Sequence, residues 1–275
     1  MDGTTYEHGR RSHAQRNEEE QAAPQPRRGM HLSLKMGRAI PYDSPAKRDL
    51  LLLLDSDPAV VGYSDTDETL LINHTLQDQQ VTHQPDYLVQ TRSYTALVDC
   101  IPAHRYTRKG ETLMREAVHA WAAQHPTATT GPPGTLDYIV FTSTQLDHNY
   151  YMHNIRLLTP YGHATLQPGI RARIYSVLDT APIPTTAPVV TPATPGTITI
   201  GELAQRLAFA SPDAARHAIY YLAYHRELVL PLADQHVTDT TPVYLPHQQP
   251  IAISYPPPTI RFPIRAGLPT HSATH

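Results

Sequence analysis

The sequence has a single cysteine, Cys100, among its 275 residues. An internal disulfide is therefore excluded, and the position of Cys100 in an apolar segment predicts a buried side chain more than a nucleophile.

Long apolar runs are also absent. The longest, Leu50 to Leu54, is far too short to cross a bilayer, and the N-terminus lacks the apolar core of a signal peptide. We therefore expect a cytoplasmic protein with no membrane partner.

Lysine is almost as scarce as cysteine. Only Lys35, Lys47 and Lys109 occur among the 22 basic residues, so arginine carries nearly all of the positive charge. The formal net charge of −3 at pH 7 gives no overall attraction to nucleic acid. Any DNA binding must therefore come from local basic patches.

Glycine is sparse, with 13 residues against 27 prolines, which predicts extended linkers and tails around compact units. A chain of this length can form one core of about 150 residues and a smaller second unit. We expect a mixed-charge tail at 1–30, an α/β domain at 31–178, a Pro- and Thr-rich linker at 179–196, a small second domain at 197–246 and a Pro-rich tail at 247–275. The first tail either stays solvated or tracks a DNA backbone.

The pattern of residues 31–178 predicts a mixed sheet flanked by helices. Ser44 followed by Pro45 is a good helix start, and this helix should run to about Asp55. Apolar, β-branched runs predict strands at 57–63, 70–74, 85–89, 96–102 and 138–141, and helical periodicity predicts helices at 111–123, 149–161 and 169–178. The helix at 111–123 is expected to be a crossover to the last strand.

The C-terminal unit has the pattern of a winged helix-turn-helix. Helices are predicted at 202–209 and 212–225, followed by a two-stranded wing at 228–230 and 243–245. The second helix of such a unit often enters the major groove of DNA, and Arg216 is the arginine that it would offer. Residues 197–246 carry three arginines and five acids. A protein-docking module therefore suits this charge at least as well as a DNA reader.

Two carboxylates lie on the hairpin predicted from 85–89 and 96–102. Asp86 opens the first strand and Asp99 lies midway along the second, so antiparallel pairing would bring them together. Such a pair can hold Mg²⁺, which stabilises charge on a phosphate and acidifies an attacking water, while a lysine completes the chemistry. In phosphodiester nucleases that use such a hairpin, this lysine lies two residues after the second acid, and that position here is Ile101. Among the scattered histidines, only His83, two residues before Pro85-Asp86, lies close to the first of these carboxylates in the sequence.

A basic cluster follows the hairpin directly. It consists of His104, Arg105, Arg108, Lys109 and Arg115. The cluster is either a solvated surface or a DNA contact. The candidate DNA-binding residues are therefore Arg105, Arg108, Lys109, Arg115 and Arg216.

An ordered series of motifs resembles the TnsA family, the endonuclease subunits of heteromeric transposases. The motifs are Ser33-Leu34-Lys35-Met36-Gly37-Arg38, Ser44-x-x-x-Arg48-Asp49-Leu50-Leu51, Asp57-Pro58-x-Val60-Val61, Pro85-Asp86-Tyr87-Leu88-Val89, Leu97-Val98-Asp99 and Asn154-Ile155-Arg156-Leu157-Leu158. The resemblance spans about residues 31 to 246. It implies a restriction-endonuclease-like fold of the PD-(D/E)xK type followed by a winged helix. It also implies Mg²⁺-dependent cutting at transposon 5′ ends, in complex with a DDE transposase and an ATPase regulator.

Carried over one residue at a time, the resemblance places the family's helix glutamate at Lys47, its metal-binding aspartate at Asp86, the acid of the second strand at Asp99 and the catalytic lysine at Ile101. Loss of such an electrostatic group typically costs about 10²- to 10³-fold in rate. A Lys47 ammonium would also compete with a metal ion for the two aspartates. We therefore expect a remnant site with a Lys47–Asp86 ion pair and no cofactor, in a subunit that binds DNA, a transposase or both without cutting.

Two alternatives remain open. An active endonuclease would hold Mg²⁺ on Asp86 and Asp99, with Asp49 or Asp55 in place of the helix glutamate and Lys47 as the working lysine. A protein-binding scaffold with no DNA contact would suit the acidic C-terminal unit.

Overall fold

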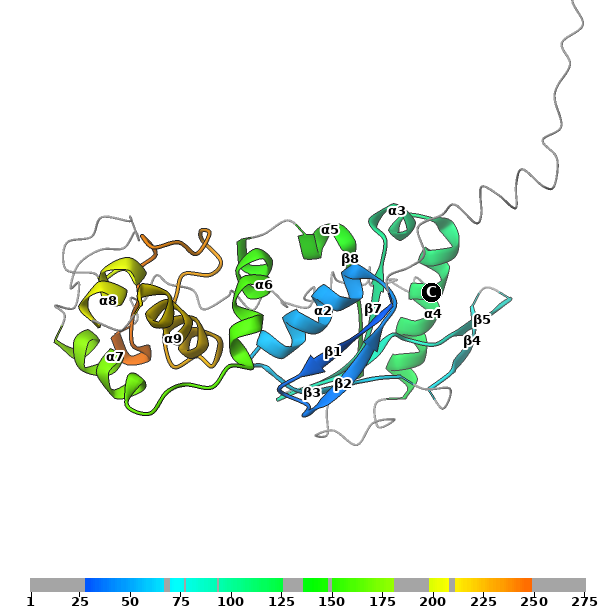
Figure 1. The fold of residues 1–275 in the computed structure, drawn as a ribbon. Helices are drawn as coiled ribbons and strands as arrows, with labels where there is room; N and C mark the ends of the chain where they lie inside the picture. Colours follow the sequence, from blue (N-terminus) through cyan, green and yellow to red (C-terminus); the bar gives the residue numbers. More distant parts are fainter. Residues whose placement is uncertain are drawn as a thin grey trace, which may run out of the picture.

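The computed structural model describes residues 28–66, 70–76, 78–92, 94–125, 136–147, 150–180, 198–207 and 211–248. Nearly all of both predicted tails and of the predicted linker lies outside these ranges. Figure 1 shows an α/β part on one side and a group of helices from the C-terminal half on the other. None of the described helices is long and apolar enough to span a membrane.

The α/β part is built on a four-stranded mixed sheet in the order β3-β6-β7-β8. Its strands are β3 (Val60–Asp65), β6 (Tyr87–Thr91), β7 (Thr95–Ile101) and β8 (Leu136–Thr142). β3, β6 and β7 pair antiparallel, whereas β8 runs parallel to β7. The parallel pair is joined through helix α4 (Lys109–Gln124), as a parallel connection requires. The expected α/β class with a mixed sheet flanked by helices is thus confirmed.

Helix α2 (Pro45–Ser56) begins where the sequence predicted. The Ser44 hydroxyl accepts a hydrogen bond from the backbone N–H of Lys47 at 3.2 Å, and Pro45 occupies the first turn. Its run from Leu50 to Leu54 is buried. All seven residues of β7 are buried as well, because α2 packs on one face of the sheet and α4 on the other.

Two separate two-stranded ribbons accompany the sheet. β1 (Gly29–Ser33) pairs with β2 (Arg38–Tyr42), and β4 (Ile72–Leu76) pairs with β5 (Gln79–His83). The strand predicted at 70–74 was expected within the main sheet, and this expectation is wrong. The fully buried Ile72 shares a core cluster with Val118 and Ala122 of α4, so burial holds β4 against the helix instead.

The second core crosses the predicted domain boundary at residue 178. It contains Leu158 of α6 (Tyr150–Gly162) and Ile174 of α7 (Ile170–Asp179), together with apolar residues of α8 (Ile200–Arg206) and α9 (Pro212–Tyr224). A short α5 (Ser143–Asp147) precedes α6, and a 3-10 turn, η1 (Pro246–Gln248), ends the described chain. α7 therefore packs with the C-terminal unit and not with the sheet.

The predicted two-stranded wing does not form. Residues 228–230 and 243–245 are joined by one isolated antiparallel bridge, in which Val229 and Tyr244 exchange backbone hydrogen bonds of 2.9 and 3.1 Å. Pro231 and Pro242 lie beside this bridge. Because proline has no backbone N–H, it cannot extend the ladder.

Candidate functional site

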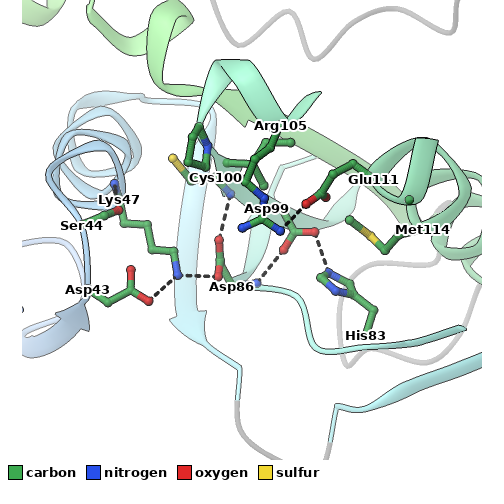
Figure 2. A pocket seen from close by; sticks show the side chains of 13 residues that line it. Asp43, Ser44, Lys47, His83, Asp86, Asp99, Cys100, Arg105, Glu111 and Met114 are labelled. Carbon is green, nitrogen blue, oxygen red and sulfur yellow. Dashed lines mark hydrogen bonds and ion pairs between the residues drawn. The ribbon is translucent and has the colours of Figure 1, made fainter. Parts of the chain in front are cut away.

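The β6–β7 hairpin brings its two aspartates together, as the sequence predicted (Figure 2). The backbone N–H of Asp86 donates to Asp99 Oδ1 at 2.9 Å. In return, the backbone N–H of Cys100 donates to Asp86 Oδ2 at 2.8 Å. These reciprocal bonds fix both carboxylates at the junction of the two strands. The Cys100 side chain is buried, which raises its thiol pKa to about 12 and agrees with a packing role.

The ion pair expected between Lys47 and Asp86 is present. Lys47 Nζ lies 2.8 Å from Asp86 Oδ1 and 2.8 Å from Asp43 Oδ2, between the two carboxylates in Figure 2. Burial alone would lower the lysine pKa, but the hydrogen bonds to Asp43 and Asp86 outweigh it and raise the pKa of Lys47. The first turn of α2 therefore holds a permanent positive charge against the acid pair.

Asp99 is held by a second group of donors. His83 Nε2 lies 2.7 Å from Asp99 Oδ2, and the Tyr138 hydroxyl from β8 donates to the same oxygen. Burial acts to lower the pKa of His83, but the hydrogen bond and charge of Asp99 outweigh it and raise the pKa. Burial and Asp99 together raise the pKa of Tyr138, which keeps its hydroxyl protonated as a donor.

Asp86 and Asp99 repel each other in a partly dry environment. Burial first, and then the negative charge of Asp99, raise the pKa of Asp86, although the contact with Lys47 acts in the opposite direction. The protein offsets this repulsion with a lysine on one side and a histidine on the other. The site is thus an acid pair compensated by the chain's own donors.

A pocket of about 540 Å³ is lined by four of these residues, Lys47, His83, Asp86 and Asp99. Its lining includes the apolar residues Ile101, Pro102 and Met114. It also includes Arg105, which forms an ion pair with Glu111, the first acid of α4 (Figure 2). The aliphatic Ile101 therefore lines the pocket at the position where the resemblance implies a catalytic lysine.

These residues do not fit a Mg²⁺ site. Both oxygens of Asp86 and both oxygens of Asp99 already accept hydrogen bonds or ion pairs from the protein. Mg²⁺ requires oxygen ligands in near-octahedral geometry and would compete with these donors for the carboxylate lone pairs. Within the described ranges, no group of three histidine, cysteine, aspartate or glutamate side chains is arranged to hold a metal ion.

The acids considered as replacements for the helix glutamate lie elsewhere. Asp49 forms an ion pair with Arg156 of α6 at 2.7 Å. Asp55 binds His31 of β1 at 2.8 Å and accepts hydrogen bonds from the hydroxyls of Ser33 and Tyr63. Neither residue lines the pocket that contains Asp86 and Asp99.

The candidate DNA-binding residues differ in how far they are already engaged. Arg105 pairs with Glu111, and Arg115 stacks over the ring of Tyr106 at 3.9 Å. Arg108 and Lys109 are exposed at the start of α4.

Arg216, on α9, is engaged within the C-terminal unit. Its guanidinium pairs with Asp239 at 2.6 Å and with Asp213 at 3.0 Å. The helix that carries it has buried residues along much of its length, including Ile219, Leu222 and Ala223. Both its charge and its helix are therefore already used by intramolecular contacts.

Sequence reasoning missed three residues of this site. The sequence predicts only that Tyr138 belongs to a buried strand. Its contact with Asp99 follows from the parallel pairing of β7 with β8, which the local sequence does not specify. Glu111 was read only as the start of a helix. Asp43 carried a usable signal, because it lies four residues before Lys47 at the helix start, where opposite charges meet.

No protein-family model matches this chain, and no curated protein sequence is significantly similar to it.

Proposed function

We propose that this chain is a TnsA-like subunit acting in DNA transposition or DNA processing, which binds DNA, a transposase partner or both without cutting. Its α/β part would be a restriction-endonuclease-like domain, and its C-terminal helices a reduced winged helix. The observation that carries the proposal is the Lys47 ammonium, 2.8 Å from Asp86 in the pocket that also contains Asp99. A cation supplied by the chain takes the position where a catalytic metal ion would be needed.

Three features oppose metal-dependent cutting. Lys47 attracts the acid pair directly, and opposite unit charges about 4 Å apart attract by roughly 4 kcal/mol at an effective dielectric of about 20. His83 and Tyr138 both contact the same oxygen of Asp99, Oδ2. Ile101 offers neither charge nor a proton beside a phosphate. A divalent cation would therefore have to break several existing contacts for an incomplete ligand set.

A nicking assay tests the absence of cutting. Supercoiled plasmid incubated with the purified chain and Mn²⁺ should remain intact, and Asp86→Ala should behave identically. Nicking by the wild type that Asp86→Ala abolishes would show that the acid pair is catalytic and would overturn this part of the proposal.

A protein-binding scaffold without DNA contact is the second candidate. It is favoured by the engagement of Arg216 with Asp213 and Asp239, which removes the arginine of α9 from a role in binding phosphate. A gel shift at increasing salt separates the two candidates, because phosphate contacts weaken as salt rises. DNA binding that falls steeply with salt supports the first candidate, whereas no shift at low salt supports the scaffold.

A further inference from the structure

The β4–β5 ribbon has two unlike faces. Its register pairs Ile72 with His83 and Thr75 with Gln80. On the inner face, Ile72 is buried against α4 and His83 reaches the pocket. On the outer face lie four exposed polar residues: Asn73, Thr75, Gln80 and Thr82. This outer face is uncharged and carries hydrogen-bond donors and acceptors, although the Thr82 hydroxyl already donates to Asn73 Oδ1 at 2.8 Å.

The edges of the ribbon are open as well. Among the described residues, no backbone group outside the ribbon hydrogen-bonds to β4 or β5. The edge strand β3 of the main sheet differs, because the sulfur of Met36 accepts a hydrogen bond from the backbone N–H of Tyr63 at 3.3 Å. Figure 1 shows the ribbon extending past α4 at the end of the α/β part away from the C-terminal helices. Within the described part of the chain, the four outer-face side chains are exposed.

The geometry points to duplex DNA as that partner: we propose that the outer face of β4–β5 enters the major groove and contacts base edges. The inference rests on the proposed DNA binding and names the element that reads sequence. The major groove admits a two-stranded ribbon. Asn and Gln side chains pair with adenine there, and threonine contacts either a base edge or the thymine methyl group.

Charge complementarity supports DNA more than a protein strand. The exposed cations Arg108 and Lys109 begin α4, more than two helical turns before Val118, which shares a core cluster with Ile72 of the ribbon, and they would contact phosphates that flank the groove. The four outer-face side chains add no charge that would repel a phosphate. Among the described residues, two exposed acids oppose binding: Asp78 in the turn of the ribbon, with φ of 61°, and Glu116 on α4.

Selection of binding sites from a pool of random-sequence duplexes tests the inference. The wild type should enrich a short motif and bind it about tenfold or more tightly than a scrambled duplex. The ribbon variant Thr75→Val/Gln80→Ala should bind the scrambled duplex as before but lose this preference. Valine keeps the β-branched shape of threonine, so the variant preserves the strand. Ser176→Ala/Gln205→Ala, at exposed positions of α7 and α8, is the matched control and should retain the motif.

Two further variants separate base contacts from phosphate contacts. Arg108→Ala/Lys109→Ala should weaken binding to all duplexes and reduce the salt slope by about 2, with the motif unchanged. Asp78→Asn should strengthen binding to all duplexes several-fold, because it removes a negative charge while asparagine tolerates the left-handed backbone.

The failures can be told apart. A wild type that binds no duplex at low salt overturns the DNA-binding part of the proposed function, and the ribbon inference falls with it. A motif that survives Thr75→Val/Gln80→Ala overturns the ribbon inference alone. A wild-type dimer that becomes monomeric in the ribbon variant overturns it in favour of strand pairing between two copies of the chain.

Discussion

A single side chain, Lys47, decides how the acid pair behaves. It lies in the first turn of α2 and contacts both Asp43 and Asp86. The sequence predicted the contact with Asp86, because the resemblance aligned Lys47 with an acid that normally shares a metal ion with this aspartate. The contacts of Asp99 with Tyr138 and of Arg105 with Glu111 were not predicted, since they depend on strand and helix placement that no local pattern specifies.

Replacing Lys47 should destabilise the fold. Lys47→Ala leaves Asp86 beside Asp99 with no compensating cation on that side, and we expect a loss of about 1–3 kcal/mol in the free energy of unfolding. Chemical denaturation measures the change. Lys109→Ala removes a lysine that is exposed and should stay within about 0.5 kcal/mol of the wild type. Equal stability of all three proteins would show that the Lys47 pair has no structural role.

His83 should make stability depend on pH. Its pKa is raised above the ordinary value of 6.5 by Asp99, so the folded state binds the proton more tightly than the unfolded state. The stabilisation is therefore complete below pH 6.5 and is lost as pH rises through the raised pKa. Unfolding free energies across this window should fall more steeply for the wild type than for His83→Gln. Parallel curves would contradict the role assigned to the His83–Asp99 pair.

At the scale of elements, local signals predicted α2, α4 and the β6–β7 hairpin. Ser44 and Pro45 start α2, and apolar runs define the two hairpin strands. The same signals failed for the ribbon β4–β5 and for the wing. The apolar run around Ile72 predicts a strand, but it does not specify whether that strand packs against the sheet or against a helix. The wing is limited to a single bridge at Val229 because prolines flank it.

Asn154 is the clearest test of how the elements are joined. Its fully buried side chain donates to the carbonyl oxygens of Leu232 and Gln235 at 2.8 and 2.7 Å and accepts from the N–H of Val237 at 2.9 Å. Asn154→Ala leaves these three groups without their partner and should cost about 2–4 kcal/mol in unfolding free energy. Thermal or chemical denaturation measures it. Gln205→Ala on the exposed face of α8 serves as the control, and an equally small effect of both substitutions would refute the role of Asn154.

At the scale of the molecule, two cores share helix α6. Ile155 packs in the core beneath the sheet, whereas Leu158, one turn further along, packs in the core of the C-terminal unit. The sequence predicted a division at residue 178 from the proline-rich stretch that follows. Proline content marks where a chain is extended, but it does not report which core an earlier helix joins.

The shared helix predicts joint unfolding. Because α6 contributes to both cores, differential scanning calorimetry of the full chain should show one cooperative transition. Two well-separated transitions would mean that the C-terminal unit unfolds independently of the sheet. The Asn154→Ala variant should broaden or split the transition, since it removes contacts between α6 and the 232–237 loop.

The central claim is that Lys47 takes the position of a catalytic metal ion beside Asp86 and Asp99. Calorimetric titration of the full chain with Mn²⁺ tests it most directly. The account predicts no saturable binding at micromolar Mn²⁺, either in the wild type or in Asp86→Ala. Micromolar binding by the wild type that disappears in Asp86→Ala would contradict it.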